Sequence, residues 1–178
     1  MSSWSDVLKE AQIIIEKDIF MNSIITSFIL NHSTFSSAIS FSLAQSFDGI
    51  IPFIQWHNLY VSVLSECNEY EKGMETLEEI GLLDLIAISL RDPASEGLVN
   101  PFLNFKGYKA LQAHRIAHVL WKAGRKDTAR AIQSRCSELF AVDIHPAAVI
   151  GNAIYIIAIF LYCYYSWQYL ENIDEICV

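Results

Sequence analysis

The first 140 residues carry apolar side chains at helical spacing and show no strand-like alternation of apolar and polar residues. Each such segment buries only one face, so several of them must pack together around a shared core. The sequence therefore predicts an all-α unit over residues 1–140. In the segment that opens the chain, the predicted buried face consists of Val7, Leu8, Ala11, Ile14 and Ile15.

Proline and glycine mark the predicted helix ends. Pro93 disfavours helical backbone at the residue before it, so a helix is expected to stop in RDP, with Asp92 at the boundary. Gly124 follows YKALQAHRIAHVLWKA and is typical of a helix C-terminus. Between these two stops, Pro101 and Gly107 bracket the stretch NPFLNFKG, which we interpret as a short apolar turn.

Charge and cysteine content narrow the class of protein. The net charge of −8 argues against a nucleic-acid partner, because phosphate binding needs a cationic surface. Eight of the twelve Lys and Arg residues lie between Lys106 and Arg135, where they permit a local anion site, although basic residues on solvated helix faces are the favoured interpretation. The four cysteines have no CxxC or metal-ligand spacing, and MSSWSDVLKEAQ has no early apolar core. These features predict reduced thiols and a cytoplasmic location.

The pattern changes after Phe140. In VDIHPAAVIG, two isoleucines stand six residues apart at Ile144 and Ile150, a period typical of a left-handed parallel β-helix. Asp143 and His145 flank Ile144, and strand-like alternation places both on the face opposite it. Asp143 is then either a carboxylate that orients a catalytic histidine elsewhere or part of turn chemistry at the entry to a domain.

Two further candidates each have a structural alternative. Asp92 on a rigid loop can bind a substrate ammonium or hydroxyl group, but from the residues alone a local helix cap is favoured. His114 and His118 stand four apart on one helix face, a spacing that can bind zinc. Because HExxH and a third ligand are missing, we favour packing at a helix–helix or subunit contact.

A family resemblance joins these features. The stretch RDPASEGLVNPFLNFKGYKALQAHRIAHVLWKAGRK, followed by SRCSELFAVDIHPAAVIG, resembles serine acetyltransferases of cysteine biosynthesis, and LNHSTFSSAISFSLAQ resembles their N-terminal helical region. The resemblance covers about residues 20–151. It implies a helical domain over residues 1–140 and first hexapeptide-repeat residues over 141–151. It also implies trimers of β-helices that the helical domains join into a hexamer.

The resemblance also implies a reaction. Serine acetyltransferases move the acetyl group of acetyl-CoA, their co-substrate, to the serine hydroxyl, with a histidine as general base and no metal. Asp92 matches the RDP aspartate that contacts serine, and Asp143 matches the aspartate that orients the catalytic histidine. The family docks O-acetylserine sulfhydrylase through a C-terminal tail.

Residues 152–178 depart from the family. The stretch NAIYIIAIFLYCYY stands where the family has a glycine-containing hexad and an Asp-His pair. No histidine follows His145 in the sequence. We therefore expect the catalytic histidine, the acetyl-CoA-binding coils and the sulfhydrylase-docking tail to be absent, and the chain to be inactive by itself. The partners expected through the helical domain are copies of this chain or full-length serine acetyltransferase subunits.

The apolar tail has three interpretations. Ala153–Leu170 is 18 residues long and uncharged, just enough for a membrane span, with aromatic residues that suit an interface. A continued repeat fails because Tyr162 takes the next inward position. A frame departure after a true coding segment is favoured, so a membrane location is not expected. The predicted fold is mainly α, with the truncated start of a left-handed parallel β-helix and an atypical apolar tail.

Overall fold

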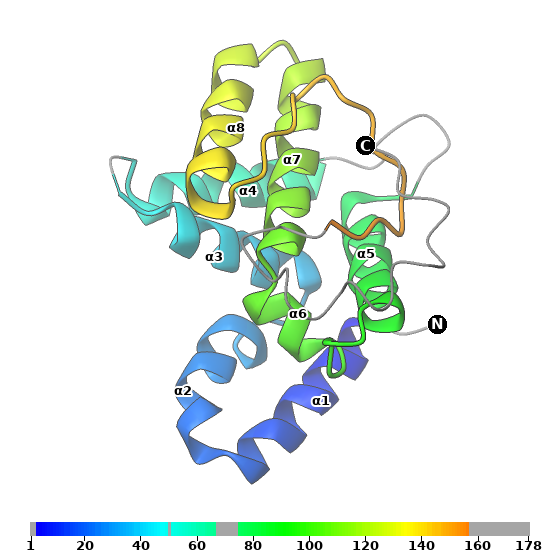
Figure 1. Cartoon of the computed structure of the whole chain (residues 1–178). Helices are drawn as coiled ribbons and strands as arrows, with labels where there is room; N and C mark the ends of the chain where they lie inside the picture. Colours follow the sequence, from blue (N-terminus) through cyan, green and yellow to red (C-terminus); the bar gives the residue numbers. More distant parts are fainter. Residues whose placement is uncertain (1–2, 50, 67–74, 157–178) are drawn as a thin grey trace.

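The structure is a computed structural model that describes residues 3–49, 51–66 and 75–156 (Figure 1). This part of the chain contains helices and no strand, which confirms the all-α prediction. The α-helices are α1 (Trp4–Lys17), α2 (Asn22–Ile25), α3 (Phe35–Phe47), α4 (Phe53–Glu66), α5 (Leu77–Arg91), α6 (Val99–Asn104), α7 (Lys106–Lys122) and α8 (Lys126–Phe140). A 3₁₀ turn, η1 (Ile19–Met21), and a π turn, η2 (Thr26–Leu30), flank α2.

Helix α7 lies at the centre of the arrangement (Figure 1). It packs most extensively against α8 and also contacts α3, α4, α5 and α6. Helices α3 and α4 form a second closely packed pair, whereas α1 and α2 extend as an arm at one end (Figure 1). The central position of α7 places its side chains against several neighbours at once, and this explains why most of its residues are buried.

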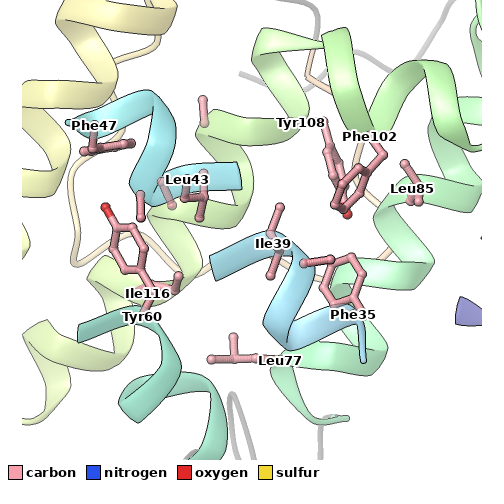
Figure 2. Close-up of a cluster of buried hydrophobic side chains, with 14 of the residues drawn as sticks. Phe35, Ile39, Leu43, Phe47, Tyr60, Leu77, Leu85, Phe102, Tyr108 and Ile116 are labelled. Atoms are coloured by element: carbon pink, nitrogen blue, oxygen red, sulfur yellow. The ribbon is translucent and has the colours of Figure 1, made fainter. Parts of the chain in front are cut away.

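Helix α3 supplies the middle of the hydrophobic core (Figure 2). Phe35, Ile39, Leu43 and Phe47 recur every four residues and are all buried, as one face of a helix requires. Phe35 lies against Gly81 of α5, where a Cβ atom would come within 2.5 Å of the Phe35 ring. The glycine therefore allows α3 and α5 to approach closely.

The predicted helix stops are confirmed, and one predicted turn is wrong. Helix α5 ends at Arg91 directly before Asp92-Pro93, and α7 is followed by Gly124 with a φ of 79°. The stretch NPFLNFKG is not a turn, because residues 99–104 form helix α6 and Gly107 lies inside α7. Pro101 is compatible with α6 because it stands in the first turn, where a backbone N–H has no helical partner.

A residue distant in sequence caps α6. The Glu10 carboxylate of α1 accepts hydrogen bonds from the backbone N–H groups of Leu98 (3.0 and 2.9 Å) and Val99 (2.9 Å). These donors would otherwise be unsatisfied at the start of the helix. The turn prediction failed because this capping group lies almost ninety positions away along the chain.

The end of α8 offers a stability test. Ala141 terminates α8 in the left-handed conformation with a φ of 57°, which strains residues that carry a Cβ atom. Ala141→Gly is therefore expected to raise the free energy of unfolding by about 1 kcal/mol, measured by urea denaturation with circular dichroism. The matched control Ala131→Gly, inside α8, should lower it by about 1 kcal/mol. A loss of stability in both variants would contradict the prediction.

Residues 141–156 follow α8 without forming a helix or strand and run back along α7 toward α5 (Figure 1). The predicted start of a β-helix at 141–151 therefore stays a prediction. Most of the apolar tail, residues 157–178, lies outside the described part of the chain. Among the residues that the structure does describe, no helix is long and apolar enough to cross a membrane.

Candidate functional site

Asp92 stands at the C-terminal end of α5. Pro93 forces the backbone out of the helix there, with Asp92 at φ −94° and ψ 113°. One carboxylate oxygen, Oδ1, accepts a hydrogen bond from the backbone N–H of Ala94 at 2.8 Å, and Oδ2 accepts one from the Tyr155 hydroxyl. The side chain is half-buried. Asp92 thus shapes its own turn and also contacts the segment that follows α8.

A buried ion pair lies between α5 and α7. Arg115 donates from Nε and Nη2 to the two carboxylate oxygens of Asp84, at 2.8 and 2.9 Å, and the side chains are 1% and 0% exposed. Gln112 Nε2 and the backbone N–H of Ile154 complete the donors, each at 2.9 Å. Burial raises the pKa of the Asp84 carboxyl, while the Arg115 guanidinium opposes that shift. With four donors, the carboxylate is well satisfied.

Helix α7 holds the backbone of residues 146–151. His118 Nδ1 bonds to the carbonyl of Pro146 at 2.8 Å, and His114 Nε2 bonds to that of Ala148 at 3.2 Å. Arg115 donates to the carbonyl of Ile150 at 3.2 Å and to that of Gly151 at 2.7 Å. Residues 145–148 form a turn, closed by a hydrogen bond from the Ala148 N–H to the His145 carbonyl at 2.9 Å. The carbonyls of residues 146, 148, 150 and 151 face α7 along this turn and the segment that follows it.

These contacts answer two open questions about the basic segment and the histidine pair. Arg115 is buried, so the interpretation of the basic residues as solvated is wrong at this position. His114 and His118 are also buried, and each bonds to a backbone carbonyl of the segment after α8. His114 lies at the contact with α8 as well, where it faces Ile132 and Cys136 across a small cavity. Among the described residues, no three His, Cys, Asp or Glu side chains gather closely enough to hold a metal ion.

His114 makes stability depend on pH. Its bond to a carbonyl requires the proton on Nε2, and burial lowers its pKa from 6.5 to about 4. The folded state therefore binds fewer protons than the unfolded state, and stability present above pH 6.5 is lost as pH falls toward 4. From pH 7 to pH 5, His114 should lower the free energy of unfolding by about 2 kcal/mol.

Urea denaturation of the His114→Gln variant at both pH values checks this contribution. The variant should show a smaller loss of stability on acidification than the original chain, because glutamine does not titrate. Ser134→Ala is the matched control, since Ser134 is exposed on α8 and carries no titrating side chain, so this variant should keep the pH dependence of the original chain. An identical pH dependence in the His114→Gln variant would refute the assignment.

Asp143 and His145 lie on the opposite face from Ile144, as alternation predicts. Both side chains are exposed, and Asp143 Oδ1 accepts a hydrogen bond from Gln133 Nε2 at 2.7 Å. The His145 ring packs edge-on against Trp121, with centroids 4.9 Å apart. Asp92 and Asp143 share none of these partners, so the described contacts do not join the two predicted site residues. Their catalytic and substrate-binding roles stay predictions.

A small cavity lies between α7, α8 and residues 142–144 of the segment that follows α8. Its volume is about 10 Å³, room for about one water molecule and far too little for an amino acid. Its walls are formed by Ala110, His114, Ala117, Ile132, Gln133, Cys136, Val142 and Ile144. Because Ile144 points into this cavity, Asp143 and His145 are directed away from it.

Sequence reasoning missed the residues that build this region. Asp84 lies on a largely apolar helix, and periodicity gave no sign that it would meet Arg115. The available signal was the ALQAHR stretch, in which Gln112, His114 and Arg115 are polar residues on a helix otherwise rich in buried apolar positions. Polar residues on a buried helix face need partners, and a search for matching carboxylates would have pointed to Asp84.

Comparison with known proteins identifies the family to which the chain is similar. Residues 3–113 match the family model described as serine acetyltransferase, N-terminal. Serine acetyltransferase 1, chloroplastic, of Arabidopsis thaliana is 40% identical over 152 residues, which are 85% of this chain and 46% of the relative. The chain thus spans about half the length of the curated relatives it matches.

Solved structures agree with this match. Soybean serine acetyltransferase complexed with serine aligns with a TM-score of 0.76 and 34% identity, over 84% of this chain and 59% of the soybean chain. The Brucella abortus strain S19 enzyme in complex with coenzyme A aligns with a TM-score of 0.75 and 30% identity, over 84% of this chain and 58% of that one. This chain therefore belongs to the serine acetyltransferase family.

Proposed function

We propose that this chain is the helical, serine-binding part of a serine O-acetyltransferase, which converts acetyl-CoA and L-serine to O-acetyl-L-serine and CoA in cysteine biosynthesis. The observation that carries the proposal is the docking of residues 146–155 against α7 and α5. This docking sets residues 153–155, which directly follow the first repeat residues, beside Asp92 at the end of α5. The soybean and Brucella relatives, solved with serine and with coenzyme A, support the choice of substrates.

In the proposed reaction, the Asp92 carboxylate binds the serine ammonium group and Asp143 orients a histidine base. The base removes the hydroxyl proton, the hydroxyl oxygen attacks the thioester carbonyl, the C–S bond breaks, and the CoA thiolate takes up a proton. Acetyl-CoA is a co-substrate, and the proposal includes no metal. No histidine follows His145 in this sequence, so the 178-residue chain by itself is proposed to lack the base.

Two experiments test the proposal. A thiol-release assay of the 178-residue chain with acetyl-CoA and L-serine should stay at background, and turnover would refute the proposed inactivity. Titration of L-serine into ¹⁵N-labelled chain should shift the backbone amide signals around Asp92. Asp92→Asn should abolish these shifts, whereas the matched variant Asp143→Asn should retain them, because Asp143 is assigned to the histidine. If serine causes no shifts at any concentration, either in this chain or in its Tyr155→Phe variant, the serine-binding assignment fails.

Exposed apolar residues favour a second function as an oligomerisation module. Ile19 is 86% exposed and Phe20 80% exposed, and Ile13 and Ile24 lie on the same α1–α2 arm. Such a patch on one arm is typical of a protein–protein contact. We propose that it joins copies of this chain or full-length serine acetyltransferase subunits; docking of O-acetylserine sulfhydrylase is not proposed.

Light scattering and pull-down with a full-length serine acetyltransferase measure this association. The double substitution Ile19→Ser with Phe20→Ser should reduce both self-association and capture. Leu90→Ser is the control, since Leu90 is 81% exposed but belongs to α5 and not to the α1–α2 arm. A chain that stays monomeric and captures no subunit would rule out the module. The cytoplasmic location stays a prediction, as the Arabidopsis relative is named chloroplastic.

A further inference from the structure

The Asp92 carboxylate already has a partner from its own chain on each oxygen. Oδ1 accepts the Ala94 N–H at 2.8 Å, and Oδ2 accepts the Tyr155 hydroxyl. The first contact is local and fixes the turn after α5. The second joins residues 63 positions apart, so it depends on how the segment after α8 is placed.

Hydrogen bonds on the residues just before Tyr155 set that placement. Arg91 Nη1 donates to the carbonyl of Ala153 at 2.9 Å, and the backbone N–H of Ile154 donates to Asp84 at 2.9 Å. Both partners belong to α5, the helix that ends at Asp92. Tyr155 packs against the hydrophobic core and is half-buried. The phenol is therefore held beside the carboxylate by a backbone that α5 itself anchors.

We propose that Tyr155 occludes Asp92. Its hydroxyl takes the hydrogen-bonding position beside the Asp92 carboxylate where a substrate ammonium group would bind. The inference rests on the proposed function, which assigns that carboxylate to serine. An intramolecular donor needs no association step, whereas serine must bind from solution and displace it. The apparent affinity for serine is then reduced by the fraction of molecules in which Tyr155 stays in place.

The phenol is suited to this role at neutral pH. Burial raises the pKa of the Tyr155 hydroxyl well above its ordinary value, and the neighbouring Asp92 carboxylate acts in the same direction. Tyr155 thus remains protonated and able to donate. A hydrogen bond to an ionised carboxylate is among the stronger kinds in proteins.

The test is the affinity for L-serine of the full 178-residue chain, measured by NMR titration of the amides around Asp92. Tyr155→Phe keeps the ring and removes only the donor, so it should bind serine at least about tenfold more tightly than the original chain, the factor that one such hydrogen bond is worth. Tyr60→Phe is the matched control, because the Tyr60 hydroxyl is buried without a partner among the described residues, and it should not change the affinity. Adding Asp92→Asn to Tyr155→Phe should abolish binding.

Each outcome has one meaning. Equal affinity in the original chain and in Tyr155→Phe overturns the occlusion and leaves the proposed function intact. Absence of serine binding in both chains overturns the assignment of Asp92 to serine, and the occlusion with it. Tighter binding that survives Asp92→Asn places the serine elsewhere and also overturns the inference.

Discussion

Arg115→Ala is expected to lower the free energy of unfolding by about 3–5 kcal/mol, the usual cost of removing one partner from a buried ion pair. Asp84 is 0% exposed and would keep only Gln112 and the Ile154 N–H as donors. The carbonyls of Ile150 and Gly151 would lose their donor as well. Urea denaturation followed by circular dichroism at pH 7 measures the loss.

The charge left on Asp84 should also make the loss of stability in Arg115→Ala depend on pH. Without Arg115 the opposing effect on the Asp84 pKa is removed, so the folded-state pKa should rise further above its unfolded value. A raised folded-state pKa makes stability fall as pH rises through it, so Arg115→Ala should cost less at acidic pH than at pH 7. A loss of the same size at every pH would show that Asp84 carries no unpaired charge.

A double substitution separates the charge from the packing. Asp84→Leu combined with Arg115→Met removes both charges and keeps similar volume, so it should recover most of the stability lost in Arg115→Ala. If the double variant is as unstable as the single one, the hydrogen bonds to the segment after α8, rather than the unpaired carboxylate, dominate the cost.

Gly97→Ala is the second substitution with a large expected effect, a loss of about 3 kcal/mol. Gly97 has a φ of 74°, and a Cβ atom there would lie 2.3 Å from the Glu10 carboxylate. The alanine must adopt a strained backbone and also displace Glu10, which then loses its hydrogen bonds to the start of α6. Thermal or urea unfolding of the full chain measures the change.

Two further variants isolate the contribution of Glu10. Gly124→Ala is the matched control, because Gly124 has a φ of 79° and no atom within 4 Å of the added Cβ; it should cost only about 1 kcal/mol. In a Glu10→Ala background, Gly97→Ala should likewise cost about 1 kcal/mol, since no carboxylate remains to be displaced. Equal losses from Gly97→Ala and Gly124→Ala would mean that the contact with Glu10 contributes nothing.

Local chemistry was enough to predict where α5 and α7 end. Pro93 and Gly124 act on the backbone of their own neighbours, so the ends of α5 and α7 could be located from a few residues. The alternation around Ile144 likewise predicted that Asp143 and His145 would lie on the face opposite it, and both side chains are exposed there. These features depend on sequence neighbours alone.

Partners far apart in the chain could not be predicted in the same way. Glu10 caps α6, Asp84 meets Arg115, and Tyr155 reaches Asp92, and each pair is brought together only by the packing of helices. Helical spacing identifies the buried face of a helix but not the residue that will lie opposite it. The sequence therefore indicated Asp92 as a candidate residue but gave no indication that the Tyr155 hydroxyl would donate a hydrogen bond to its carboxylate.

The contacts of α7 with residues 146–151 have a consequence for how this protein tolerates change. Every acceptor in them is a main-chain carbonyl, a group that all twenty amino acids possess. Contacts of this kind do not depend on side-chain identity, and they require only that the backbone keep the turn at residues 145–148 and the path that follows it. The helical unit should consequently accept foreign peptides grafted after Pro146, which makes this junction a natural point for recombining the domain with new continuations.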